Sequence, residues 1–199
     1  MNLYRKGPVE IVTNTVQGMC PWVTAKFSTL YASVFAYSAP TLDEWNRETL
    51  LASDNIVSFG LIGEDVVAGL SCSQKLNDAG RSLTVHGLIS NGKAKRVAAP
   101  LIAAATRFAR NQSKIPLSAE AIICEIDGKP NIGSAKALTR NGFYHAERTR
   151  GKIEHSNSHF LLSDPKHVGT IAVHKLVASS NDLIEFGDWI LKDWEEIPV

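Results

Sequence analysis

Short stretches rich in apolar residues predict the β-strands of this protein. They lie at residues 10–16, 55–62, 65–73, 83–89 and 119–126. Apolar and polar positions alternate along residues 83–89, as in a strand that has one face in the core and the other in solvent. Only a Gly-Glu pair separates the second stretch from the third, and a polar turn with a glycine follows the third. These three strands are therefore predicted to form an antiparallel meander.

Apolar residues at helical spacing predict helices between these strands. The helices are residues 21–37, 41–53, 97–110 and 131–141. The first carries an aromatic stripe that is predicted to pack in the core, although its edge could also border a substrate cleft. The second opens with a Thr-Leu-Asp-Glu capping box. The third has an alanine-rich face, and Pro100 lies in its first turn, where a missing N–H costs little.

The fourth helix has a marked end. Gly142 follows its last apolar positions, and a glycine there accepts the left-handed conformation that closes a helix, with Phe143 folding back toward Leu138. The order of elements is strand, two helices, three strands, helix, strand, helix. This order predicts an α/β (α+β) fold with a mixed sheet, in which the strands at residues 83–89 and 119–126 run parallel.

The C-terminal part of the chain has weaker patterns. Residues 143–153 and 159–163 are predicted to be two closing strands, whereas residues 168–176 fit a helix and a strand equally well. Asp182 to Glu185 forms a second capping-box pattern, which opens a predicted helix with an apolar stripe. The stripe consists of Leu183, Phe186, Ile190 and Trp194. We expect this stripe to dock on the rest of the protein, and a homodimer contact is the alternative.

Length and composition favour one globular domain. The 199 residues are 44% hydrophobic, which is enough to bury a single core. We expect residues 1–163 to form a domain and residues 164–199 to form an extension packed on it. The net charge of +1 and three scattered cysteines predict no nucleic-acid partner, no disulfide framework and no metal site. The sequence has neither a secretion signal nor a long apolar run, which predicts a cytoplasmic protein with no membrane partner.

Cationic residues gather in the turn that precedes the third helix. They are Lys93, Lys95 and Arg96. The first amides of a helix have no partner within it, and the helix dipole adds positive potential, so a cationic loop that leads into a helix is physically an anion site. The other interpretation is an ordinary solvated surface loop.

Two segments resemble the GCN5-related N-acetyltransferase (GNAT) superfamily. Residues 131–143 read Asn-Ile-Gly-Ser-Ala-Lys-Ala-Leu-Thr-Arg-Asn-Gly-Phe, which is similar to the family's Asn-x-x-Ala/Ser…Gly-Phe segment without a gap. Residues 93–98 read Lys-Ala-Lys-Arg-Val-Ala and fall where the family has Gln/Arg-x-x-Gly-x-Gly/Ala. Lys93 stands in for Gln or Arg, Arg96 replaces the first glycine, and Ala98 fits the last position.

The resemblance implies a GNAT-like fold. In such a fold the mixed sheet splays between the two parallel strands and is flanked by helices, and here an extra C-terminal helical segment follows. The implied co-substrate is acetyl-CoA or another acyl-CoA. Its pyrophosphate would lie on the amides from Arg96 through Val97 and Ala98 to Ala99, with Lys93 and Lys95 adding charge. Its thioester carbonyl would be polarised by an amide of Leu88 or Ile89, and Asn131 and Ser134 are also assigned to its binding.

The resemblance also implies groups for proton transfer. The family's acid is usually a tyrosine at the position of Leu138, and leucine has no proton to give, so Tyr144 and Cys124 are the substitute candidates, with packing in the core as the alternative for both. His86 is the candidate base, because an imidazole with a pKa near neutrality can deprotonate an ammonium. The alternative for His86 is a histidine that only forms hydrogen bonds within the sheet.

Two functions from different classes remain open. The first is an acyl-CoA-dependent N-acyltransferase, which we expect to transfer acetyl from acetyl-CoA to an amine of an unidentified small molecule or protein. The second is a catalytically inactive GNAT-fold protein that acts by binding another protein, which Leu138, Arg96 and the C-terminal extension favour. A third function, action on an aminoacyl-tRNA, is disfavoured by the near-zero net charge.

Overall fold

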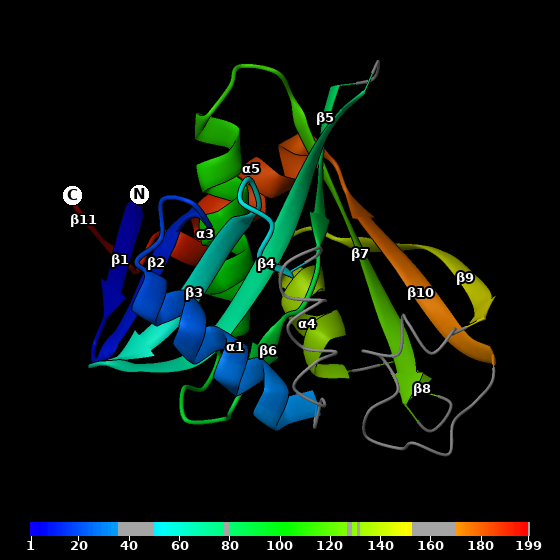
Figure 1. Ribbon diagram of the computed structural model, residues 1–199. Coiled ribbons are helices and arrows are strands. Elements are labelled where there is room, and N and C mark those ends of the chain that lie inside the picture. Colours follow the sequence, from blue (N-terminus) through cyan, green and yellow to red (C-terminus); the bar gives the residue numbers. More distant parts are fainter. Residues whose placement is uncertain (36–49, 78–79, 127–128, 131, 153–169, 199) are drawn as a thin grey trace.

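The structure is a computed structural model that describes residues 1–198 apart from residues 36–49, 78–79, 127–128, 131 and 153–169. One mixed β-sheet runs through it, with helices on both faces (Figure 1). The strands are β1 (Asn2–Lys6), β2 (Val9–Thr15), β3 (Ile56–Ile62), β4 (Asp65–Asn77), β5 (Gly80–Val85), β6 (Ile89–Ser90), β7 (Leu117–Ile126), β8 (Lys129–Pro130), β9 (Tyr144–Lys152), β10 (Thr170–Ala178) and β11 (Glu195–Ile197). The helices are α1 (Pro21–Phe35), α3 (Ala98–Asn111), α4 (Ile132–Arg140) and α5 (Ser180–Leu191). The predicted α/β class is confirmed.

The sheet contains the predicted meander and extends it on both sides. Its order is β11-β1-β2-β3-β4-β5-β7-β10-β9, with β6 beside β4 and β8 beside β7. Neighbouring strands from β1 to β5 are antiparallel. β5 and β7 are parallel, as predicted, because α3 returns the chain to the same end of the sheet between them. The last two strands at one end of the sheet, β1 and β11, were not predicted.

β5 and β7 separate after a short paired stretch. They pair from Arg81 beside Leu117 to Val85 beside Ala121. Beyond this point β7 continues along β10, whereas the chain after β5 turns away and returns to β4 as β6. Figure 1 shows the two halves of the sheet diverging below the paired stretch. The predicted parallel and splayed pair is therefore confirmed.

The strand predicted at residues 83–89 is broken in its middle, so this part of the prediction is wrong. β5 ends at Val85, and pairing resumes only in β6. Between them the backbone N–H of His86 donates to the carbonyl of Ser71 on β4 at 2.8 Å. A Cβ atom on Gly87 would also overlap a buried ring of α1. Both contacts involve residues distant in the sequence, so local alternation cannot reveal them.

Helices cover the two faces of the sheet differently. α1 packs on β4 and β6, while α3 packs on β2, β3 and β4 on the other face and is joined there by α4 and α5 (Figure 1). Phe27 and Tyr31 of α1 are buried with Phe59 of β3, which confirms the core prediction for this part of the aromatic stripe. Trp22, at the start of the stripe, is 45% exposed, so the prediction is wrong for that residue. The helix predicted at residues 41–53 lies mostly outside the described residues.

The end of α4 agrees with the prediction. Gly142 has a φ of +81°, its N–H donates to the carbonyl of Thr139 at 3.1 Å, and the N–H of Phe143 donates to the carbonyl of Leu138 at 3.2 Å. This pair of bonds is the Schellman closure of a helix. The Phe143 side chain is buried in the same cluster as Leu138. The glycine therefore ends the helix and turns the chain into β9.

In the C-terminal part of the chain, the structure decides between helix and strand for residues 170–178 and corrects the predicted start of the last helix. Residues 170–178 form a strand, β10, which lies between β7 and β9. β9 is the first of the two predicted closing strands, and the second lies outside the described residues. α5 starts earlier than predicted: the Ser179 hydroxyl accepts from the N–H of Asp182 at 3.2 Å, so Asp182 closes the capping box instead of opening it. In the predicted stripe, Phe186 is 38% exposed, whereas Leu183 is buried.

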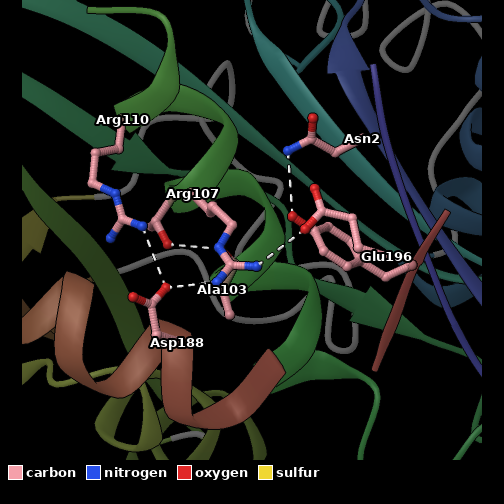
Figure 2. Close-up of polar contacts among 8 residues, drawn as sticks. Asn2, Ala103, Arg107, Arg110, Asp188 and Glu196 are labelled. Atoms are coloured by element: carbon pink, nitrogen blue, oxygen red, sulfur yellow. Dashed lines mark hydrogen bonds and ion pairs between the residues drawn. The ribbon is translucent and has the colours of Figure 1, made fainter. Parts of the chain in front are cut away.

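An ion-pair cluster joins α5 and β11 to α3. Arg107 of α3 lies between Asp188, at 2.9 Å, and Glu196, at 3.7 Å, and Arg110 also reaches Asp188, at 3.3 Å (Figure 2). The Arg107 guanidinium also lies 6.0 Å from the ring centre of Tyr4 on β1. These contacts tie β1, the edge strand β11 and the C-terminal helix to the central helix of the fold.

Candidate functional site

The turn before α3 is held by its own backbone and by two buried anchors. The N–H of Asn91 donates to the carbonyl of Val67 on β4 at 3.0 Å, and the Asn91 side-chain oxygen accepts from the N–H of Lys93 at 3.0 Å. Ala94 and Val97 are buried in the core. The turn is therefore a fixed loop that carries its cationic side chains outward.

Arg96 has an unusual backbone conformation. Its φ is +61°, and within the described residues every other residue with a positive φ is a glycine. An L-residue with a side chain adopts this conformation at a cost of about 1–2 kcal/mol. The GNAT resemblance places a glycine at this position, so the backbone keeps a glycine-like conformation while an arginine occupies it. The side chain adds a guanidinium, which can donate two hydrogen bonds to one phosphate.

The N-terminus of α3 has no side-chain cap. Val97 is the N-cap residue and its side chain forms no capping hydrogen bond. The amides of Ala98 and Ala99 belong to the first turn, where intrahelical acceptors do not exist, and Pro100 has no N–H. Lys95 and Arg96 are exposed beside this turn and form no ion pair with any described residue, whereas Lys93 lies 3.5 Å from Asp65. The arrangement can bind an anion.

The buried side chain of Asn141 holds the first turn of α3 through a hydrogen bond, a role that the sequence did not reveal. The residue is 1% exposed, and its side-chain N–H₂ group donates to the carbonyl of Ala99 on α3 at 3.1 Å and to that of Ala137 on α4 at 2.9 Å. The local signal, an asparagine before the glycine that ends α4, indicates a helix end and gives no hint of a bond to α3. The position of the α3 N-terminus thus depends on α4.

His86 lies where β5 and β7 begin to part. Its ring nitrogen Nε2 lies 2.8 Å from the hydroxyl of Ser73 on β4. Burial lowers the pKa of His86, the nearby Lys75 lowers it further, and Glu120 raises it. The net shift is downward from the ordinary value of 6.5, so the imidazole is neutral at pH 7 and can accept a proton.

Glu120 on β7 is a second candidate that the sequence analysis missed. It lies beside Thr84 in the parallel pair, and the Thr84 hydroxyl donates to it at 3.1 Å. Lys175 on β10 lies 2.8 Å from its other oxygen. The hydrogen bond from Lys175 lowers the pKa of Glu120, so the carboxylate is ionised at neutral pH. Alternation along β7 could have placed Glu120 opposite the buried Ala119 face, but its partners are set by register.

These groups share one face of the sheet with Tyr144. Thr84, Glu120, Val177 and Tyr144 are successive partners across β5, β7, β10 and β9, and directly paired residues point to the same face. Tyr144 is 59% exposed there, so it does not pack in the core. Leu138 is 2% exposed in the opposite layer. The residue at the family's usual acid position is therefore a core residue in this protein.

The remaining predicted site residues lie around the parting strands. Ile89 is buried and pairs with Gly69 of β4, and Leu88 is half-buried just before it. Ser134 is half-buried in the first turn of α4. Asn131 lies outside the described residues. His86, Leu88 and Ile89 thus lie in the segment that leads from β5 into β6, and Ser134 lies on the helix that follows β7.

A buried polar network supports this segment from behind. The Ser71 hydroxyl donates to the carbonyl of Leu50 at 2.5 Å, and the Asn55 side chain donates to Ser71 Oγ at 3.2 Å. Ser71 is fully buried, and its own carbonyl holds the N–H of His86. A Cβ atom on Gly87 would lie 2.5 Å from the Tyr31 ring. The chain has little freedom to move at this point.

The described part of the chain has neither a metal-binding cluster nor a membrane-spanning helix. No group of three or more His, Cys, Asp or Glu side chains there could hold a metal ion. None of the helices described is both long enough and apolar enough to cross a membrane.

Comparisons with known proteins find relatives by structure. No protein-family model and no curated protein matches the sequence. An N-acetyltransferase from Staphylococcus aureus Mu50 superposes with a TM-score of 0.61 at 16% identity, over 88% of this chain and 99% of that one. A chain of the NatC complex bound to Gag peptide and CoA gives 0.55 at 11% identity, over 85% and 98%. A probable acetyltransferase of the GNAT family from Chromobacterium violaceum ATCC 12472 gives 0.56 at 13% identity, over 89% and 91%.

Identities this low carry information about the fold alone. The superposed regions include nearly the whole of each neighbour, so the likeness concerns the complete architecture. This chain has the fold of the GNAT N-acetyltransferases.

Proposed function

We propose that this protein is an acyl-CoA-dependent N-acyltransferase that transfers an acyl group, in the simplest case acetyl, to a primary amine. The observation that carries the proposal is the uncapped N-terminus of α3, preceded by a loop in which Arg96 keeps a glycine-like backbone, next to two parallel strands that part. These features suit a long ligand with a pyrophosphate at one end and an extended amide-bearing arm at the other.

Residues from three elements would hold acyl-CoA. The amides from Arg96 through Val97 and Ala98 to Ala99 would receive the pyrophosphate, with Lys93, Lys95 and Arg96 adding charge. The backbone of Leu88 or Ile89 would donate to the thioester carbonyl, and Asn131 and Ser134 would contact the arm. The co-substrate supplies an activated acyl carbonyl whose leaving group is a thiolate.

His86 would act as the base in this reaction. Its neutral imidazole would take a proton from the ammonium of the acceptor, and the freed amine nitrogen would bond to the acyl carbon as the carbon–sulfur bond breaks. Leu138 is a core residue with no proton to donate, so the thiolate would take its proton from Tyr144 or from water, and the proton that the nitrogen loses as the amide forms would replace it. The chain of the NatC complex was solved with a peptide and CoA, which supports a peptide or protein amine among the acceptor candidates for this protein.

Calorimetric titration with coenzyme A tests the binding half of the proposal. Binding should release measurable heat, weaken as salt is raised, and weaken further in Lys95→Ala, because the phosphates interact with this cation. Lys114→Ala is the matched control: this exposed lysine follows the far end of α3, and its loss should leave affinity unchanged. Absence of binding at millimolar coenzyme A would refute the acyl-CoA site.

The second candidate is a catalytically inactive protein of the same fold that acts by binding another protein. The observation in its favour is the buried Leu138 at the usual acid position. A turnover assay distinguishes the two candidate functions. The transferase should release free thiol from acetyl-CoA when amines or amine-bearing peptides are supplied. Tight coenzyme A binding without thiol release for small amines, amino acids and peptides alike would favour the inactive protein.

A further inference from the structure

Two residues of one strand hold His86 from the same side. Its backbone N–H donates to the carbonyl of Ser71, and its ring nitrogen Nε2 lies 2.8 Å from the hydroxyl of Ser73, both on β4. Ser73 pairs directly with Thr84 across the ladder, so its side chain lies on the face that carries Thr84 and Glu120. β4 therefore fixes both the backbone and the ring of His86.

We propose that Ser73 is a positioning residue for His86: its hydroxyl accepts a hydrogen bond from Nε2–H of the imidazole and so leaves Nδ1 as the nitrogen that takes the proton of the acceptor amine. This inference rests on the proposed transferase function. It assigns the tautomer of the base and names a residue that neither the resemblance nor the comparisons single out.

The choice between the two directions of the hydrogen bond follows from the chemistry of imidazole. A neutral ring has one N–H and one acceptor nitrogen. If Ser73 donated to Nε2, the ring proton would sit on Nδ1, and a proton from the substrate could reach the ring only through the Ser73 hydroxyl. With Nε2–H donating to Ser73, the lone pair is on Nδ1, and no described residue forms a hydrogen bond to that atom. Only this tautomer can take the proton of the amine directly.

The surroundings of His86 make the hydroxyl decisive for its orientation. The backbone on either side is fixed by the Ser71 bond and by the close approach of Gly87 to Tyr31, so rotation of the side chain is the freedom that remains. The charged groups that influence the ring are Lys75 of β4 and Glu120 of β7, and Glu120 is itself paired with Lys175 of β10. None of these is an alternative hydrogen-bond partner for Nε2 among the described contacts.

Nitrogen-15 NMR of the full-length protein tests the inference without any activity measurement. In protein labelled at its six histidines, the His86 signals, identified by their loss in His86→Gln, should show a single neutral tautomer with the proton on Nε2. Ser73→Ala should bring the chemical shifts toward a mixture of tautomers, and Ser73→Thr should restore the wild-type shifts. The matched control is Ser82→Ala, which removes a hydroxyl from the same sheet face four residues before His86. A proton on Nδ1 in the wild type, or identical His86 shifts in Ser73→Ala, would overturn the inference.

Kinetics then separate positioning from binding. Ser73→Ala should lower kcat about ten- to hundredfold, since misplacing a catalytic group by about 1 Å has effects of that size, and should leave the KM for acyl-CoA unchanged. Ser73→Thr should recover most of the loss. Unchanged kcat in Ser73→Ala would overturn the positioning role. Complete absence of transfer by the wild type, together with the expected tautomer, would instead refute the proposed function and leave the hydrogen bond standing.

Discussion

Replacing Gly142 with alanine should destabilise the protein by more than its backbone conformation alone requires. The glycine has a φ of +81°, where an L-residue is strained by about 1 kcal/mol or more. An added Cβ atom would also lie 2.7 Å from Cβ of Asp182 and 2.9 Å from Cδ2 of Phe186, both on α5. Phe186 can rotate away, but Asp182 is held in the capping box with Ser179, so α5 itself would have to shift.

The two effects can be summed and then separated. Overpacking costs about 1–3 kcal/mol, which with the strain gives a total loss of about 2–4 kcal/mol in the free energy of unfolding. At about 2–4 °C for each kcal/mol in a chain of this size, the melting temperature should fall by roughly 5–15 °C. Gly92→Ala is the matched control, because Gly92 has the same φ of +81° and no atom within 4 Å of the added Cβ.

Urea denaturation of the three proteins provides the measurement. Gly92→Ala should lose about 1 kcal/mol, and Gly142→Ala should lose about 1–3 kcal/mol more. Equal losses in the two variants would show that α5 does not pack closely against the end of α4. No loss in either variant would show that neither glycine is left-handed.

Further outcomes follow from the site and from the α3–α5 contact. His86→Ala should lower kcat about a hundredfold without changing coenzyme A affinity. In the wild type, kcat/KM should decline on the acid side with an apparent pKa below 6.5, because the pKa of His86 in the folded protein is lowered. Since the unfolded chain takes up that proton first, stability should also decline as the pH falls below about 6.5, which a urea series at several pH values would show. Arg96→Gly should keep the free energy of unfolding or raise it by up to about 1 kcal/mol, while calorimetry finds weaker coenzyme A binding with a smaller salt dependence; a clear loss of stability would contradict the strained backbone. Asp188→Ala should cost about 1 kcal/mol in urea, whereas Asp193→Ala, whose pair with Lys6 is more exposed, should cost nothing measurable.

The sequence predicted best where the signal is local. Gly142 and Phe143 are adjacent to the helix they close, so the closure could be inferred from a few residues. The capping box of α5 is also local, yet it was misplaced by three positions, because Ser179 and Asp182 both belong to residue types that cap helices. Local patterns thus identify an element more reliably than the residue at which it begins.

Register and long-range contacts account for what the sequence did not reveal. The segment around His86 leaves the strand because Ser71 and Tyr31 hold it, and neither is near it in the sequence. Glu120 is one of many surface carboxylates until the ladder places it beside Thr84 and Lys175. The pattern of residues 170–178 is also compatible with a helix, but these residues form a strand because they pair with β7 on one side and with β9 on the other.

The parting of β5 and β7 has a consequence for hydrogen–deuterium exchange. From Ile122 to Cys124, between the end of the β5 ladder and the start of the short β8 ladder, β7 keeps its pairing with β10 on one side but has lost β5 on the other, so alternate main-chain amides there lack a strand partner. In the free protein these amides should exchange rapidly, while their immediate neighbours, bonded to β10, should be protected. An extended ligand that accepts their hydrogen bonds would slow every second amide along one short stretch of β7. Such an alternating pattern of protection would locate the ligand on the sheet without a crystal.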